Sequence, residues 1–391
     1  MKKYDKVAIV CDWLTEIGGA ERVLKAVCEI FPDAPIYTSQ YRPKRAVWFR
    51  GHDVRTGWLN IFPAGLRRFM PFFRNLYFGH LDLSKYDLVI SIANAEVKGV
   101  KTRSDAVHIS YLQGPPTQYY WGLYDQYLKN PGFGALNFLA RWGLKLLVKP
   151  LRKTDYKFAQ KPDFLIANSD YVKDEIKKYY GRDAATVHPN VDVERIRELA
   201  GGLNLDSARL SKDGEKERNI FLIAGRQVSW KRVDLAIVAC IKTGDELLVI
   251  GDGPEHKNLV KLARGHDNIK FLPKYNGAAE IVQYFRSARA FLFPSLEPFG
   301  ITPIEALATG TPVIALKRGG ALDFIQDGKN GVFFDEQNVD SLVAVIKKFG
   351  KMKFDSAKIS MTAREFSEQN FKENFSKTIE KCVDKKGRSH E

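Results

Sequence analysis

Two glutamates, Glu297 and Glu305, flank the sequence P-F-G-I-T-P-I, in which a short loop leads into a helix. An apolar strand over 290–293 precedes the loop, and Thr302 and Pro303 are predicted as the N-cap and first residue of the helix, with Glu305 as the reciprocal partner of a capping box. A helix that begins at the carboxyl end of a parallel strand offers unpaired N–H groups and a positive dipole end to phosphate. The pattern indicates an anion site between two carboxylates, although either glutamate alone could be a capping or solvated residue.

Two other pairs of residues could contact the same anion. Arg226 and Lys231 follow a predicted strand and lie about one helical turn apart, a spacing that suits a diphosphate. Gly18 and Gly19 stand between an early apolar strand and a helix with apolar residues at 3.6-residue spacing, where glycine lets the backbone approach a ligand closely. Each pair on its own is more often a surface feature or a tight turn.

The elements that must position these residues alternate as strand, turn and helix along most of the chain, which predicts an α/β fold with parallel sheets. The chain has 391 residues, more than one core of ordinary size holds, so two domains are expected. We place them at residues 1–200 and 218–368, joined by a polar linker at 201–217, with a last helix at 369–391.

Composition limits the classes of function. The chain carries 61 Lys and Arg against 46 Asp and Glu, a net charge of +15, which indicates an anionic partner or surface. The four cysteines are scattered and no Asp-x-Asp occurs, so neither a zinc site, a disulfide framework nor a metal-assisted reaction is predicted. No apolar run approaches the ~20 residues of a membrane span, and 7–10 is too short for a signal sequence, so a cytoplasmic protein is expected.

Two segments, 41–80 and 133–156, combine basic residues with aromatic and aliphatic ones. Such a mixture can bind single-stranded nucleic acid or lie on an anionic lipid surface, and it can also be part core and part solvated face. In 133–156 the apolar residues recur near 3.6-residue spacing, so a helix lying in a membrane interface and an ordinary helix packed on a sheet both fit.

The E-x7-E stretch with F-G-I-T-P inside it resembles the retaining glycosyltransferases of family 4, and the likeness extends over nearly the whole chain. It implies the GT-B fold: two Rossmann-like, doubly wound parallel-sheet domains that face each other across a cleft, with the C-terminal helix crossing back to pack on the first. The resemblance assigns the donor sugar to Glu297, Phe299 and Gly300. It implies that Glu305 binds the ribose of the nucleotide. It assigns the donor diphosphate to a larger set: Gly18, Gly19, Arg226, Lys231, Gly300, Ile301 and Thr302.

The segment Q-G-P-P-T-Q-Y-Y-W-G, which begins at Gln113, resembles the Y-x-H-x-P-x-R-Y-x-W stretch of a mannosyltransferase-like subgroup within that family. Gln113 stands where the subgroup has His, and Gln118 where it has Arg. The resemblance places Gln113 at the reaction centre as a catalytic residue beside Glu297. A glutamine there can hydrogen-bond a hydroxyl but cannot take a charge.

The resemblance therefore predicts a retaining, metal-independent hexosyltransferase that needs no cofactor. The expected donor is GDP-mannose, and the expected acceptor is a lipid-linked or cell-surface glycan precursor at the inner face of the plasma membrane, reached through segments 41–80 and 133–156. A UDP-sugar-dependent transferase of the same fold, or a sugar-nucleotide epimerase, are alternatives. A nucleic-acid-binding protein is a further alternative that rests on charge alone.

Overall fold

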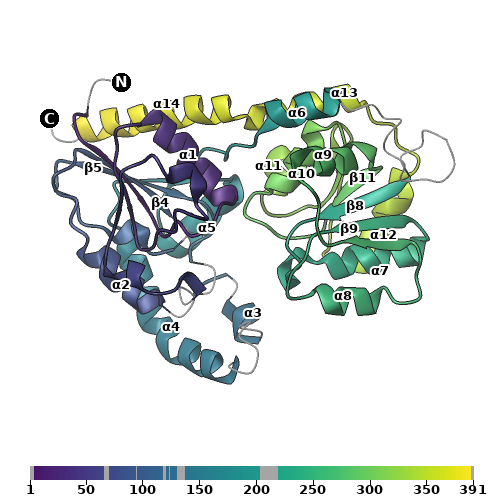
Figure 1. The fold of residues 1–391 in the computed structure, drawn as a ribbon, viewed down its shortest axis with the longest axis horizontal. Coiled ribbons are helices and arrows are strands. Elements are labelled where there is room, and N and C mark those ends of the chain that lie inside the picture. The colour runs from purple at the N-terminus through teal and green to yellow at the C-terminus, as the bar shows by residue number, and fades with distance from the viewer. Residues whose placement is uncertain are drawn as a thin grey trace. The chain divides into compact units, whose positions relative to one another are not determined.

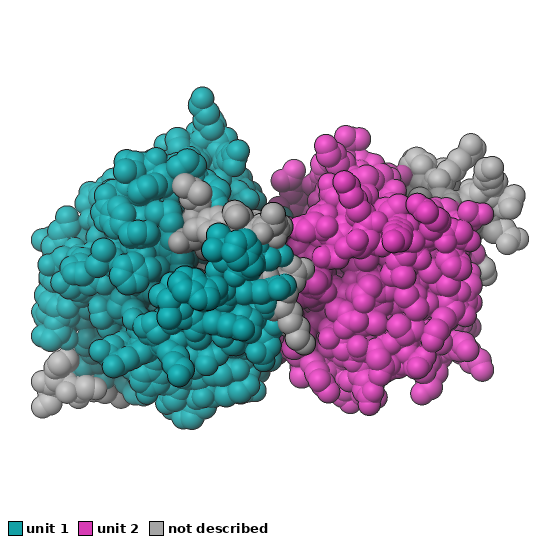
Figure 2. Space-filling model, turned by 90° about the horizontal axis from the view of Figure 1, so that it is seen from below, with its two compact units in different colours: residues 1–190, 371–391 teal, residues 191–370 magenta. Residues whose placement is uncertain are grey.

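The computed structural model describes residues 4–65, 70–93, 95–117, 120–122, 124–129, 137–202 and 219–388. The chain forms two compact units, shown in Figures 1 and 2. Unit 1 comprises residues 1–190 and 371–391, and unit 2 comprises residues 191–370. The predicted linker falls almost entirely outside the described residues, and the division into units lies at Asn190 rather than at residue 200.

Unit 1 is built on a seven-stranded parallel sheet in the order β3-β2-β1-β4-β5-β6-β7. Its two central strands, β4 and β5, are buried along their whole length, as expected for strands with helices on both faces. The strands are β1 (Val7–Cys11), β2 (Ile36–Thr38), β3 (Val54–Thr56), β4 (Leu88–Ala93), β5 (Val107–Leu112), β6 (Phe164–Ala167) and β7 (Ala184–Thr186). The helices are α1 (Gly19–Ile30), α2 (Pro71–His80), α3 (Tyr124–Lys129), α4 (Asn137–Ala159), α5 (Asp170–Tyr180) and most of α14 (Glu368–Arg388), with short 3₁₀ turns η1 (Val47–Phe49), η2 (Trp58–Ile61) and η4 (Val97–Gly99).

Unit 2 carries a six-stranded parallel sheet in the order β10-β9-β8-β11-β12-β13. Its strands are β8 (Ile220–Ala224), β9 (Glu246–Ile250), β10 (Ile269–Leu272), β11 (Ala290–Phe293), β12 (Val313–Leu316) and β13 (Gly331–Phe334). Its helices are α6 (Val193–Gly202), α7 (Val233–Thr243), α8 (His256–Leu262), α9 (Ala278–Ser287), α10 (Ile301–Ala308), α11 (Ala321–Phe324), α12 (Val339–Phe349) and α13 (Ser356–Thr362), with 3₁₀ turns η7 (Ser229–Lys231) and η8 (Ala363–Phe366).

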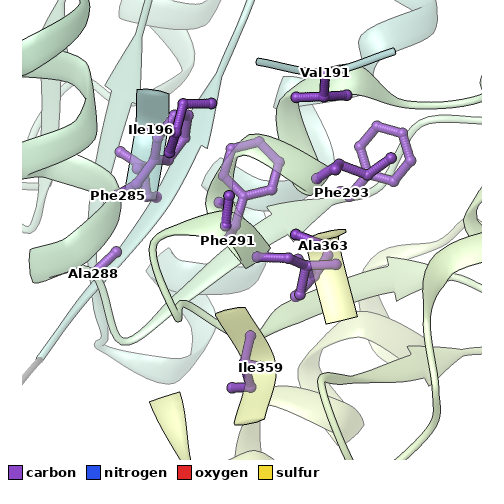
Figure 3. Close-up of a cluster of buried hydrophobic side chains, with 14 of the residues drawn as sticks. Val191, Ile196, Phe285, Ala288, Phe291, Phe293, Ile359 and Ala363 are labelled. Carbon is purple, nitrogen blue, oxygen red and sulfur yellow. The ribbon is translucent and has the colours of Figure 1, made fainter. Parts of the chain in front are cut away.

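Both faces of the unit 2 sheet are covered by apolar cores. Along β11, Phe291 and Phe293 point into one core and Ala290 and Leu292 into the other, as the two-residue period of a strand requires. Figure 3 shows the first core, where Phe291 and Phe293 lie among side chains of α9, α13 and η8. The strand that leads into the glutamate stretch is therefore held from both sides.

The C-terminal helix α14 packs on unit 1. Phe371, Phe375, Ile379 and Cys382 are buried, at the spacing of one helical face. Phe375 lies edge-on to Tyr111 of β5, with ring centroids 5.9 Å apart. The prediction of two Rossmann-like parallel-sheet domains with a C-terminal helix is thereby confirmed.

Candidate active site

The candidate site lies in unit 2, where the strand order reverses direction between β8 and β11. Loops leave the carboxyl ends of these two neighbouring strands in opposite directions, and in open α/β sheets ligands bind in the crevice between such loops. The segment after β8 carries Arg226 and Lys231, and the loop after β11 carries Glu297 and leads to Thr302 in the first turn of α10. All four line a pocket in this crevice, whose floor is formed by apolar residues at the ends of β8, β9 and β11.

Lys231 and Glu297 form an ion pair inside the pocket. Lys231 Nζ donates to Glu297 Oε1 at 2.5 Å, and the two side chains are 25% and 15% exposed. The hydroxyl of Ser295, a buried residue, donates to the same oxygen at 2.7 Å. Glu297 is therefore held in one orientation with its charge compensated, and Lys231 lies where it could exchange the carboxylate for a phosphate oxygen.

Helix α10 begins two residues earlier than the capping pattern predicts. Its N-cap is Gly300, at φ +121°, and no side chain caps the helix. The prediction of Thr302 as N-cap and Glu305 as a capping-box partner is therefore wrong, because Thr302 is the second residue of the helix. The earlier start leaves the first N–H groups of the helix, at Ile301 and Thr302, without a partner four residues back along the chain.

The predicted sugar contact Phe299 has a buried side chain. It is 3% exposed and packs on Phe324 and Phe366, with ring centroids 5.9 and 5.6 Å apart. Only the backbone of Phe299 is therefore open to a ligand. The side chain instead fixes the loop to the core of unit 2, just ahead of Gly300.

The turn Gly319-Gly320 supports the glutamate loop from behind. The N–H of Gly320 donates to the carbonyl of Glu297 at 3.0 Å. A Cβ at Gly320 would lie 2.3 Å from Phe299 Cα, and one at Gly319 would lie 2.7 Å from the carbonyl oxygen of Glu297. Backbone packs against backbone here, so only glycine fits.

A second glycine turn supports the loop that carries Arg226. A Cβ at Gly251 would lie 2.3 Å from the carbonyl oxygen of Gly225, and one at Gly253 the same distance from that of Gln227. The buried side chain of Gln227 donates to the carbonyl of Gly251 at 2.6 Å. The sequence analysis did not identify Gln227 or Ser295 as supports of the site. For Gln227, the available signal was the G-D-G sequence after β9, which its side chain contacts.

The remaining residues predicted in unit 2 lie on or beside the pocket. Gly300 and Ile301 adjoin Thr302 at the start of α10, and Glu305 lies one turn further along the helix, partly buried. Arg226 is exposed, and within the described part of the chain no carboxylate forms an ion pair with its guanidinium. Its charge is available to an anionic ligand. The roles of these residues stay predictions.

The other three predicted residues, Gly18, Gly19 and Gln113, belong to unit 1. Gly18 is the N-cap of α1, in an extended conformation. Gln113 follows β5, and its side-chain amide donates to the carbonyl of Ala20 in the first turn of α1 at 3.1 Å. The structure thus brings Gln113 together with the Gly18-Gly19 turn. Gln118 lies outside the described residues.

The corresponding crevice in unit 1, between β1 and β4, already contains a carboxylate. Asp12 is buried just after β1, and its side chain accepts from the N–H groups of Ala95 and Val97, at 2.8 and 3.0 Å, in the segment that follows β4. These amides therefore already donate to a buried carboxylate and are not available to an anionic ligand. Unit 2 is therefore the better place for a diphosphate.

In the described parts of the chain no helix is long and apolar enough to cross a bilayer. Over the same residues, no three His, Cys, Asp or Glu side chains group as metal ligands would.

Comparison with known proteins finds a family model that matches within unit 2. Residues 207–366, all of them in unit 2, match the family model "Glycosyl transferases group 1". D-inositol 3-phosphate glycosyltransferase of Streptomyces bingchenggensis is 34% identical over 197 residues, which is 45% of this chain and 42% of that protein. The protein of the same name from Mycobacterium sp. (strain KMS) is 28% identical over 204 residues, or 49% of this chain and 45% of that protein. The chain thus spans less than half the length of these curated relatives.

Solved structures are similar over nearly the full chain. Anabaena HepE in complex with UDP superposes with a TM-score of 0.65 at 16% identity, covering 96% of this chain and 100% of that one. The lipopolysaccharide outer core galactosyltransferase WaaB, in its apo form, gives 0.67 at 19% identity, covering 96% and 99%. At such low identity the likeness establishes the fold alone, and that fold is GT-B, as the sequence predicted.

Proposed function

We propose that the protein is a retaining glycosyltransferase that takes a sugar from a nucleotide-diphosphate donor bound in the unit 2 pocket. The observation that carries the proposal is the arrangement of Lys231, Glu297 and the start of α10 around one crevice, within residues that match the group 1 glycosyltransferases. Cations and free N–H groups stabilise a departing diphosphate, and a fixed carboxylate orients the sugar beside it.

In the proposed reaction the bond between the anomeric carbon and the diphosphate oxygen breaks, and an acceptor oxygen bonds to that carbon on the same face. The acceptor proton passes to the leaving phosphate oxygen, so the atoms balance without a covalent enzyme intermediate. Lys231, Arg226 and the N–H groups of Ile301 and Thr302 stabilise the negative charge of the leaving group. Glu297 positions the sugar. Metal independence is part of the proposal, since these groups supply the positive charge.

Two donors are proposed in order. GDP-mannose follows from the segment that begins at Gln113, although that segment lacks the subgroup's His and Arg. A UDP-sugar is the alternative, and the crystal structures of HepE with UDP and with UDP-glucose favour it. The proposed acceptor is a lipid-linked or cell-surface glycan precursor, with the protein peripheral to the inner face of the plasma membrane.

The test is a donor screen on the wild-type protein and on Glu305→Ala, with Glu365→Ala, an exposed glutamate on η8, as the matched control. Thermal unfolding is followed with GDP-mannose, UDP-glucose, UDP-galactose and UDP-N-acetylglucosamine. We expect one nucleotide sugar to raise the melting temperature of the wild type and of Glu365→Ala but not of Glu305→Ala, because Glu305 would bind the ribose.

Proton NMR of the sugar released from the stabilising donor then reports the anomeric configuration, which we expect to be that of the donor. Absence of stabilisation by every nucleotide sugar would overturn the proposed function. Interconversion of the sugar within the donor, with no transfer and no release, would indicate the epimerase alternative.

A further inference from the structure

Helix α4 of unit 1 changes character along its length. From Val148 onward a face of the helix is buried, with Val148, Leu151, Asp155 and Ala159 at spacings of three and four residues. Before Val148 not one described residue of α4 is buried. Figure 1 shows this helix at the lower edge of unit 1, away from the sheet. The second half of α4 belongs to the body of the unit, and the first half is presented to solvent.

The second half is fixed by a buried ion pair. Lys98 Nζ lies 2.6 Å from Asp155 Oδ1, and both side chains are 2% exposed. Asp155 also accepts from Thr117, Trp121 and Tyr180 at 2.9, 2.8 and 2.7 Å. A buried carboxylate with four donors fixes the helix position and rotation, and so fixes which face of the first half is exposed.

That exposed face carries large apolar side chains. Phe138, Trp142 and Leu146, each four residues from the next, are 65%, 68% and 61% exposed, and Leu139 beside them is also exposed. Leu146 and the buried Val148 are two residues apart, about 200° around the helix, so the apolar stripe lies opposite the anchored face. Pro150 stands at the junction of the two halves.

Lysine side chains lie in line with the apolar stripe and beside it. Lys149 and Lys153 follow Leu146 at three and seven residues on the same side of the helix, and Lys145 flanks the stripe; all three are exposed. Residues 137–159 contain six basic residues and a single acid, Asp155, which is buried against Lys98. We name Phe138, Leu139, Trp142, Lys145, Leu146, Lys149 and Lys153 together the α4 face.

A second apolar surface lies on the neighbouring helix α2, which contacts α4. Its exposed side chains include Phe72, Phe73 and Leu76, and Trp58 of η2 lies edge-on to Phe73 at 6.0 Å. Three basic residues of segment 41–80 are engaged within the fold. Arg42 donates to Asn60, Arg55 pairs with Asp53, and Arg74 is buried against Glu96. Helix α2 therefore adds exposed apolar side chains beside α4.

We infer that the α4 face docks the protein on an anionic phospholipid surface, with its apolar stripe among the acyl chains and its lysines at the phosphates. Two features select this partner. An apolar stripe with lysines on its flank and in line with it, without a free carboxylate, matches a hydrocarbon layer under negative headgroups. A second copy of the chain would bring the same lysines against each other, which like charges oppose. The docking deepens the peripheral membrane position proposed above, but it needs neither donor nor sugar transfer, so its failure would leave the proposed reaction standing.

The experiment is sedimentation of the full chain with vesicles of phosphatidylcholine alone, or of phosphatidylcholine mixed with phosphatidylglycerol. Two variants probe the face: Trp142→Ser with Leu146→Ser, and Lys145→Gln with Lys149→Gln and Lys153→Gln. The matched controls alter exposed residues of unit 2: Val260→Ser with Leu262→Ser, and Lys257→Gln with Lys261→Gln and Lys351→Gln. Because all of these side chains are exposed, the variants should fold, which thermal unfolding checks.

We expect the wild type and both controls to bind the anionic vesicles and not the zwitterionic ones. Each α4 variant should bind at least about tenfold more weakly, and salt at roughly 0.5 M should release the wild type. Equal binding by variants and controls, equal binding to both kinds of vesicle, or no vesicle binding would overturn the inference. Self-association of the wild type that the Trp142 and Leu146 changes abolish, without vesicle binding, would assign the face to a second copy instead. Should the serine variant fail to fold, the lysine variant alone decides.

Discussion

Gly320→Ala should displace the glutamate loop and weaken donor use without unfolding unit 2. The added Cβ would lie 2.3 Å from Phe299 Cα and 2.5 Å from the carbonyl oxygen of Pro298, whereas ordinary contacts begin at 3.4 Å. The loop must therefore move by about 1 Å. The backbone of Gly320 has φ −65°, so alanine adds no strain of its own and the effect is confined to this contact. A misplacement of about 1 Å can lower a catalytic rate by about 100-fold.

The assay is hydrolysis or transfer of the donor that the screen identifies, measured as kcat/KM. The control is Gly201→Ala in α6 of the same unit, where an added Cβ meets no atom within 4 Å. We expect the control to retain wild-type activity and Gly320→Ala to lose about two orders of magnitude. Wild-type activity in Gly320→Ala would refute the idea that the glycine turn sets the position of Glu297.

Three further predictions concern single side chains. Lys98→Met leaves Asp155 buried without its cation and should lower the free energy of unfolding, measured in urea, by about 3–5 kcal/mol. The control Lys177→Met alters an exposed ion pair and should change the free energy of unfolding little. Equal effects of the two variants would contradict the stabilising role of the buried pair. Burial lowers the pKa of His108 from 6.5 to about 3, so between these values the unfolded chain binds a proton that the folded protein does not, and stability falls as pH falls. His108→Asn should remove this loss, on the order of 2 kcal/mol between pH 7 and pH 5, and an unchanged pH dependence of urea unfolding would count against it. Arg226→Ala should weaken donor binding about tenfold by calorimetry, because it removes a charge from the pocket without removing a packed side chain; undiminished affinity would exclude a phosphate contact.

Much of the fold could be predicted because the local signals are strong. The strand at 290–293 was predicted with the bounds that the structure shows. Ser169 caps α5 and Gly181 ends it at φ +67°, as side-chain capping and a left-handed glycine require. These features depend on residues close together in the chain.

The parts that sequence reasoning missed depend on contacts between distant segments. The order of strands puts the loops after β8 and β11 side by side, and periodicity contains no information on that order. The capping prediction at Thr302 failed because the helix starts earlier, at Gly300, whose backbone has a positive φ. The side chain of Phe299, the residue before Gly300, is fixed in the core. The contacts of Gly251 with Gly225, and of Gly320 with Phe299, join residues that are far apart in sequence.

The most direct test of the central claim is calorimetric titration of the unit 2 pocket with the stabilising nucleotide sugar, comparing wild type with Lys231→Met. The control is Lys242→Met, an exposed lysine paired with Asp340 on the same unit. A charged hydrogen bond contributes about 2 kcal/mol, so we expect an affinity about 30-fold lower for Lys231→Met and unchanged for Lys242→Met. Equal affinity in all three proteins would mean that the diphosphate does not bind between Lys231 and α10, and the assignment of the site would fail.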